Sequence, residues 1–149
     1  MKIEIDQSGR IEDTSKLSVI AYSNNHQKSL LITARDKKAI QLVFRKIGQP
    51  KLFVFKLFAV AIFVLIKNNL KKIDQIIIDR EYTGYESLIK KLLFETVERN
   101  NKKIETDIVH FHSIGKKSKA HTVALKCYQI KRADSRLTSG EFFKIAFPK

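Results

Sequence analysis

Lys2-Ile3-Glu4-Ile5-Asp6 and Asp74-Gln75-Ile76-Ile77-Ile78-Asp79 are the two stretches that decide the fold of this chain. Each is a run of strand-forming residues that ends on an aspartate. The second run is apolar enough for a strand that is covered on both faces, as in the middle of an α/β sheet. If the two strands lie side by side, their terminal carboxylates meet at one edge of the sheet and repel each other unless a cation lies between them.

The remaining sequence predicts a regular series of elements around these two strands. Strands are expected over residues 2–7, 17–22, 29–34, 73–79 and 104–112, and helices over 36–47, 51–69, 84–100, 117–130 and 138–146. Asp36 is the expected cap of the first helix. We therefore expect one α/β domain over residues 1–149. Its central mixed five-stranded sheet has three antiparallel strands followed by βαβ units, and helices flank it.

The charge of the chain indicates what it binds. Lys and Arg total 29 against 15 Asp and Glu, which gives a formal net charge of +14. Such an excess favours polyanionic partners, DNA or RNA, through counterion release and steering. A protein that is lysine-rich for other reasons is the alternative.

Two features bear on the cellular location. Cys127 is the only cysteine, so neither an internal disulfide nor a cysteine-based zinc cluster is possible, and the charged, strand-like N-terminus does not resemble a signal peptide. Residues 52–66 are strongly apolar, but Lys56 interrupts them and the clean run 57–66 falls short of the roughly 20 residues that span a bilayer. We expect a cytoplasmic protein with a buried helix here and no membrane partner.

The order of elements, with acids at the ends of the first and fourth strands, resembles the ribonuclease H-like superfamily, and within it the Holliday junction resolvase branch. The resemblance covers most of the chain but depends on element order and a few residues. It implies that the first and fourth strands are neighbours, so that Asp6 and Asp79 face each other and hold Mg²⁺ or Mn²⁺. Ribonuclease H itself has a glutamate on its first helix, whereas residues 51–69 contain no acid, which moves the comparison towards resolvases.

A third group from the last core helix completes the site in that superfamily. His121 is the matching residue, as a metal ligand or a proton carrier, and Asp134 is the carboxylate alternative. Glu81 and Asp13 are further possible contributors. Resolvase-like enzymes usually act as dimers, so a homodimer is also implied. The alternative interpretation is that Asp6 and Asp79 only cap turns or helices at the strand ends.

Basic and aromatic residues next to these acids form a candidate nucleic-acid surface. The turn at Gly115 places cations and a hydroxyl at a helix N-terminus, where free amides favour phosphate, although a solvated loop is the alternative. Arg80 and Tyr82 directly follow Asp79 and suit a phosphate and an unpaired base. The full candidate set is Lys116, Lys117, Ser118, Lys119, Arg80, Tyr82, Lys131 and Arg132. His110 and His112 share one side of a strand, which is a weaker indication of a metal site.

The sequence thus favours a metal-dependent nuclease, or a resolvase-like phosphodiester hydrolase, that acts on structured nucleic acid. Asp6, Asp79 and His121 are the expected catalytic residues, and Asp6, Asp79, Glu81 and Asp134 the expected metal ligands. Two alternatives remain: a nucleic-acid-binding module with the same fold and no catalysis, and a basic structural or assembly protein.

Overall fold

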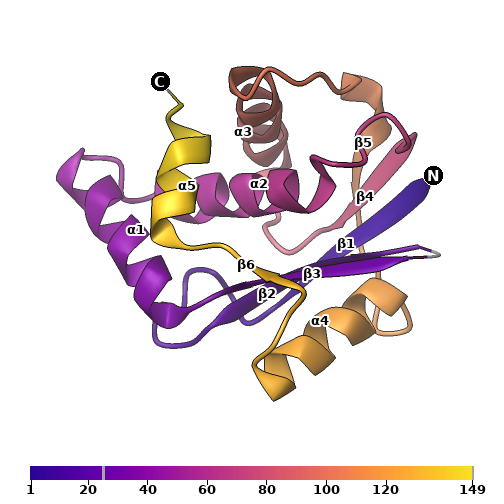
Figure 1. The fold of residues 1–149 in the computed structure, drawn as a ribbon, viewed down its shortest axis with the longest axis horizontal. Coiled ribbons are helices and arrows are strands. Elements are labelled where there is room, and N and C mark those ends of the chain that lie inside the picture. Colours follow the sequence, from indigo (N-terminus) through magenta and orange to yellow (C-terminus); the bar gives the residue numbers. More distant parts are fainter. Residues whose placement is uncertain (25, 149) are drawn as a thin grey trace.

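Three consecutive antiparallel strands form one half of the sheet in the computed structural model, which describes residues 1–24 and 26–148 (Figure 1). β1 (Lys2–Ser8) pairs with β2 (Ser18–Ser23), and β2 pairs with β3 (Gln27–Ile32). Both turns are polar, so the chain reverses direction twice before the first helix. The predicted antiparallel start of the domain is confirmed.

The other half of the sheet is parallel. β4 (Gln75–Asp79) pairs with β1, and β5 (Val109–His112) pairs with β4. The strand order is β5-β4-β1-β2-β3-β6, so β1 and β4 are neighbours, as expected.

In the described part of the chain the sheet has six strands, so the predicted number of five was wrong. The sixth, β6 (Ser135–Arg136), pairs in parallel with β3 and contains only two residues, too few to show strand periodicity. The strand expected over 104–112 is also shorter than predicted, because residues Thr106–Ile108 form a 3₁₀ turn ahead of β5.

Within residues 1–24 and 26–148, five helices cover the two faces of the sheet unequally. The helices are α1 (Ala34–Lys46), α2 (Leu52–Ile66), α3 (Glu86–Arg99), α4 (Lys119–Ile130) and α5 (Ser139–Ala146). α4 lies alone on one face, where it contacts β1, β2 and β3, and the other helices lie on the opposite face (Figure 1). α4 therefore leaves the β4–β5 end of its face without a helix.

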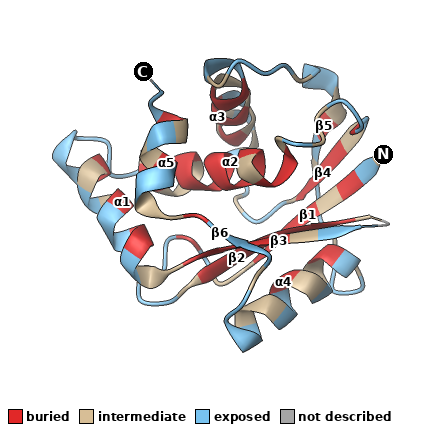
Figure 2. Ribbon diagram, viewed as in Figure 1, coloured by how far each residue is buried: buried red, intermediate tan, exposed pale blue. Residues whose placement is uncertain are grey.

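The main core surrounds α2, which is buried over most of its circumference (Figure 2). Phe53, Phe58 and Phe63 pack there with the isoleucines of β1 and β4. Burial of this apolar surface is the main contribution to stability. In the described part of the chain, no helix has both the length and the apolar character needed to cross a bilayer.

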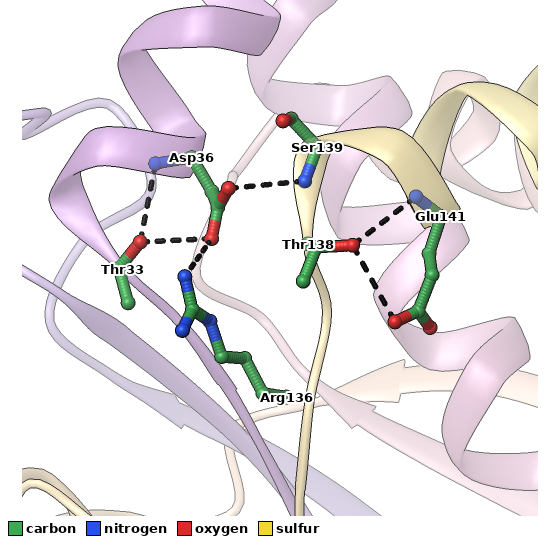
Figure 3. A network of polar contacts seen from close by, with 6 residues as sticks. All are labelled: Thr33, Asp36, Arg136, Thr138, Ser139 and Glu141. Carbon is green, nitrogen blue, oxygen red and sulfur yellow. Dashed lines mark hydrogen bonds and ion pairs between the residues drawn. The ribbon is translucent and has the colours of Figure 1, made fainter.

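The first turn of α1 makes polar contacts with residues near the C-terminus, in β6 and at the start of α5 (Figure 3). Thr33, rather than the predicted Asp36, is the N-cap of α1, and its hydroxyl accepts a hydrogen bond from the Asp36 amide. The Asp36 carboxylate accepts from Arg136 at 2.8 Å and from the Ser139 amide at 3.1 Å. One side chain in the first turn of α1 thus fixes β6 and the start of α5.

Candidate functional site

Asp6 and Asp79 lie at the same edge of the sheet because their strands are adjacent and parallel. Ile5 is opposite Ile78 in the register, and the two aspartates are the next residue on each strand. Asp6 is buried, and its Oδ1 accepts a hydrogen bond from the Gln7 amide at 2.7 Å. Asp79 is half-buried, and its Oδ1 accepts from the Ile114 amide at 2.9 Å. Both carboxylates line one cleft.

His121 projects from the first turns of α4 into this cleft. Its Nδ1 lies 2.9 Å from Asp6 Oδ2. When Asp6 is ionised it only accepts hydrogen bonds, so Nδ1 is the donor in this contact, and in the neutral imidazole Nε2 is then the acceptor. About a third of the His121 side chain is exposed. The structure therefore brings together the three residues that the sequence singled out as catalytic.

Negative charge is concentrated in the cleft. Burial raises the pKa of Asp6 above its ordinary value, and the charge of Asp79 raises it further, against the opposing effects of the Gln7 amide and His121. Partial burial also raises the pKa of Glu81, as do the charges of Asp79 and Asp6. A cation at this edge of the sheet would relieve the repulsion among these acids.

The other three candidate carboxylates lie in different places. Asp13 lines the cleft from the loop between β1 and β2. Glu81 lines the cleft with Asp6 and Asp79, although its side chain is exposed. Asp134 lies across the sheet beside β3, where its Oδ2 accepts from the amide and the hydroxyl of Ser29. Ser29 is opposite Ala21, which is opposite Asp6, so two strand spacings separate Asp134 from the cleft. Asp134 therefore has a structural partner and does not join the other acids.

The loop between β1 and β2 forms one wall of the cleft and is tightly constrained. Gly9 has a φ of +79°, and a Cβ at this position would lie 2.5 Å from the Leu17 carbonyl oxygen and 2.6 Å from the Tyr128 ring. The fully buried Lys37 donates hydrogen bonds to the carbonyl oxygens of Arg10 and Asp13. It also donates to the Ser18 hydroxyl at 2.9 Å. These contacts hold the segment that places cationic side chains at the cleft.

The basic turn before α4 forms the opposite wall. Gly115 and Lys116 line the cleft, and Lys117 and Lys119 are exposed beside it. Ser118 is the N-cap of α4 and accepts from the Ala120 amide, so its hydroxyl already has a structural role.

The other predicted cations do not extend this wall. Lys131 and Arg132 follow the opposite end of the 12-residue α4, about 18 Å along the helix axis. Arg80 is exposed and donates to the Phe111 carbonyl oxygen at 3.1 Å.

The two tyrosines after Asp79 differ in accessibility. Tyr82 packs edge-on against Phe55 and Phe58, and its hydroxyl accepts a hydrogen bond from Gln7 at 3.0 Å. Tyr85 stacks on Phe55 and is half exposed. Tyr82 thus supports the residue next to Asp6, whereas Tyr85 offers more ring surface to a partner.

The carboxylates of the cleft suit a metal site that substrate phosphates and waters complete. In residues 1–24 and 26–148, no three His, Cys, Asp or Glu side chains form a group that could hold a metal ion. Mg²⁺, however, is commonly held by one or two carboxylates together with substrate phosphates and waters. Asp6 and Asp79 supply the two carboxylates that such a site needs.

Some residues of the cleft were missed by the sequence analysis. Arg10, Lys16 and Tyr128 line it, and Gln7 joins Asp6 to Tyr82. The position of Arg10, four residues after Asp6, was the only available signal. Lys16 and Tyr128 reach the cleft through the loop reversal and the packing of α4, which no local pattern predicts.

Comparison with known proteins gives no relative for this site. No family model matches the chain, and no curated protein or solved structure matches it significantly. The geometry of the cleft is therefore the evidence for its function.

Proposed function

We propose that this protein is a metal-dependent nuclease, or resolvase-like phosphodiester hydrolase, with a ribonuclease H-like fold and a structured nucleic acid as substrate. The observation that carries the proposal is the convergence of Asp6, Asp79 and His121 in one cleft that Arg10, Lys16 and Lys116 also line. The adjacent parallel pair of β1 and β4 next to an antiparallel β1-β2-β3 unit is the arrangement that the resemblance implied. The net charge of +14 supports a polyanionic substrate.

Each residue of the cleft has a separate role in the proposed hydrolysis. Asp6 and Asp79 would hold Mg²⁺ or Mn²⁺, which when bound supplies Lewis-acid activation of water and stabilises charge on the phosphate. Asp6 also orients His121, so that Nε2 can accept a proton from the attacking water. Lys116 on one wall and Arg10 on the other can bind the phosphates that flank the cleaved bond.

The test is cleavage of labelled single-stranded, duplex, hybrid and branched substrates with Mg²⁺ or Mn²⁺, and with chelator. Asp6→Asn and Asp79→Asn should abolish cleavage, and His121→Gln should lower its rate by about 10²-fold or more. Asp107→Asn is the matched control, since Asp107 is an exposed carboxylate of the 3₁₀ turn outside the cleft. Cleavage that persists in Asp6→Asn and Asp79→Asn would refute the assignment.

A non-catalytic nucleic-acid-binding module is the second candidate, and one observation favours it. α2 contains no acid, and its buried surface is almost wholly apolar, so it adds no carboxylate to the pair formed by Asp6 and Asp79. Tight, salt-sensitive binding without cleavage in the wild type, unchanged in Asp6→Asn, would support this candidate over the enzyme.

A further inference from the structure

A second basic concavity lies at the opposite end of the sheet from the cleft. It is formed by the loop between α2 and β4 and the loop between α3 and β5. We call its cations the distal lysine cluster: Lys67, Lys71, Lys72, Lys102 and Lys103. Asn68, Asn69 and Asn101 add amide groups to the same surface. All the lysines except the half-buried Lys67 are exposed.

The charge of the distal lysine cluster is not neutralised by ion pairs. No acid lines the concavity, and no ion pair involves these five lysines within the described residues. Two acids, Asp74 and Glu105, line the adjoining pocket with Lys71 and Lys103, and Asp74 is paired with the amino terminus at 2.9 Å. The helix dipoles of α2 and α3 stabilise cations only within the last turn of each helix. Lys71 and Lys72 lie past the end of α2, and Lys102 and Lys103 lie past the end of α3. The cluster is therefore suited to an anion with several charges.

The position of the cluster relates it to the cleft. Residues 67–72 precede β4, whereas Asp79 ends it, so the five residues of β4 separate the two basic surfaces by about 17 Å. This span matches about five nucleotide steps of 3.4 Å. β5 is the edge strand beside β4, and its exposed His110 and His112 lie between the two ends. These two side chains make the β5 edge between the cluster and Asp79 polar and exposed.

We propose that the distal lysine cluster is a second binding site for the phosphate backbone of a nucleic acid. A strand or duplex engaged at the cleft passes along the β5 edge, and its flank is held by these lysines. The inference shares with the proposed function the nucleic acid as ligand, but it does not depend on catalysis. It predicts that affinity depends on substrate length, because a short oligonucleotide reaches only one of the two surfaces.

The test is a fluorescence anisotropy titration of labelled DNA and RNA, with single strands of 3 and 30 nucleotides and a 30-base-pair duplex. The variant replaces Lys71, Lys72, Lys102 and Lys103 by Gln. The control replaces Arg35, Lys38, Arg45 and Lys46 by Gln, which removes the same charge from exposed positions of α1, at the opposite side of the molecule (Figure 1). Thermal unfolding followed by circular dichroism verifies that both variants fold.

The cluster variant should bind the long substrates about tenfold or more weakly and show a shallower dependence of log Kd on log salt, by up to about 0.9 per lost phosphate contact. Its affinity for the 3-mer, and the affinity of the α1 control for all substrates, should change less than twofold. Equal weakening in both variants would show a bulk charge effect and overturn the proposal. So would equal weakening of short and long substrates, or no weakening of either. Cleavage of the same substrates by the wild-type protein with Mg²⁺ separates the two proposals, since cluster-dependent binding without any wild-type cleavage upholds this one and refutes the nuclease.

Discussion

At the scale of single residues, the candidate site depends on one glycine that contacts neither acid. Gly9 combines a φ of +79° with close approach to the Leu17 carbonyl oxygen and the Tyr128 ring. Gly9→Ala should lower the free energy of unfolding by about 2 kcal/mol or more, because the left-handed conformation is strained for alanine and the new methyl group forces backbone or α4 to move. Urea denaturation measures the loss, and nucleic-acid affinity should fall with it.

Gly48→Ala is the matched control for this prediction. Gly48 has a φ of +77°, but a Cβ there meets nothing within 4 Å. The difference in the free energy of unfolding between Gly9→Ala and Gly48→Ala therefore measures the effect of the close contact alone. Equal losses in Gly9→Ala and Gly48→Ala would contradict the role of Tyr128 and Leu17.

The same scale shows why the sequence predicted part of the site. Asp6 and Asp79 end recognisable strands, and His121 lies one turn into a recognisable helix, so element order alone brings them together. The buried Lys37, which anchors the wall of the cleft, has no such signal, because its three acceptors come from residues 19 to 27 positions away. Asp134 was misplaced for a related reason, since its partner Ser29 lies 105 residues away in the sequence.

At the scale of elements, Asp36 connects α1, β6 and α5, and this connection depends on pH. Burial raises the pKa of Asp36, but Arg136, the Ser139 amide and Thr33 outweigh it, so the net pKa lies below the ordinary value. The folded state thus binds the proton less readily than the unfolded state. The stabilisation by Asp36 is therefore complete above about pH 4–5 and is lost as the pH falls through the folded pKa.

Asp36→Asn should lower the free energy of unfolding at pH 7 by about 1.5–3 kcal/mol, since hydrogen bonds to a charged group are lost. Urea unfolding at pH values from 7 to 3 should show the difference from wild type shrinking below about pH 4. Glu141→Gln, at the exposed start of α5, should change stability by about 0.5 kcal/mol or less at every pH. A constant difference over the whole range would contradict the ionised role of Asp36.

Elements were predictable where periodicity extends over several residues. The helices and the first five strands follow from apolar spacing, with shifts of a few residues at their ends. β6 could not be predicted, because two residues carry no period and its pairing with β3 depends on Arg136 reaching Asp36. A short edge element of this kind is set by tertiary contacts.

At the scale of the whole molecule, the two faces of the sheet have unequal cores. The face covered by α2 contains most of the buried side chains, whereas beneath α4 only Val19, Ala21, Leu31 and Ala124 form a buried cluster (Figure 2). A small apolar contact gives a helix little protection against local opening. α4 carries His121, and the basic turn precedes it, so a helix held by a small apolar contact completes the candidate site.

Hydrogen exchange followed by mass spectrometry tests this asymmetry. Amides of α4 should exchange faster than those of α2, β1 and the similarly long α3, because α4 can open while the main core stays folded. A bound 30-base-pair duplex should slow exchange in α4 and the turn before it, since a ligand that requires the closed helix stabilises it by mass action. In the variant with Lys71, Lys72, Lys102 and Lys103 replaced by Gln, this protection should require more duplex, whereas the α1 control should match the wild type. Protection of free α4 equal to that of α2 would contradict the two-core description.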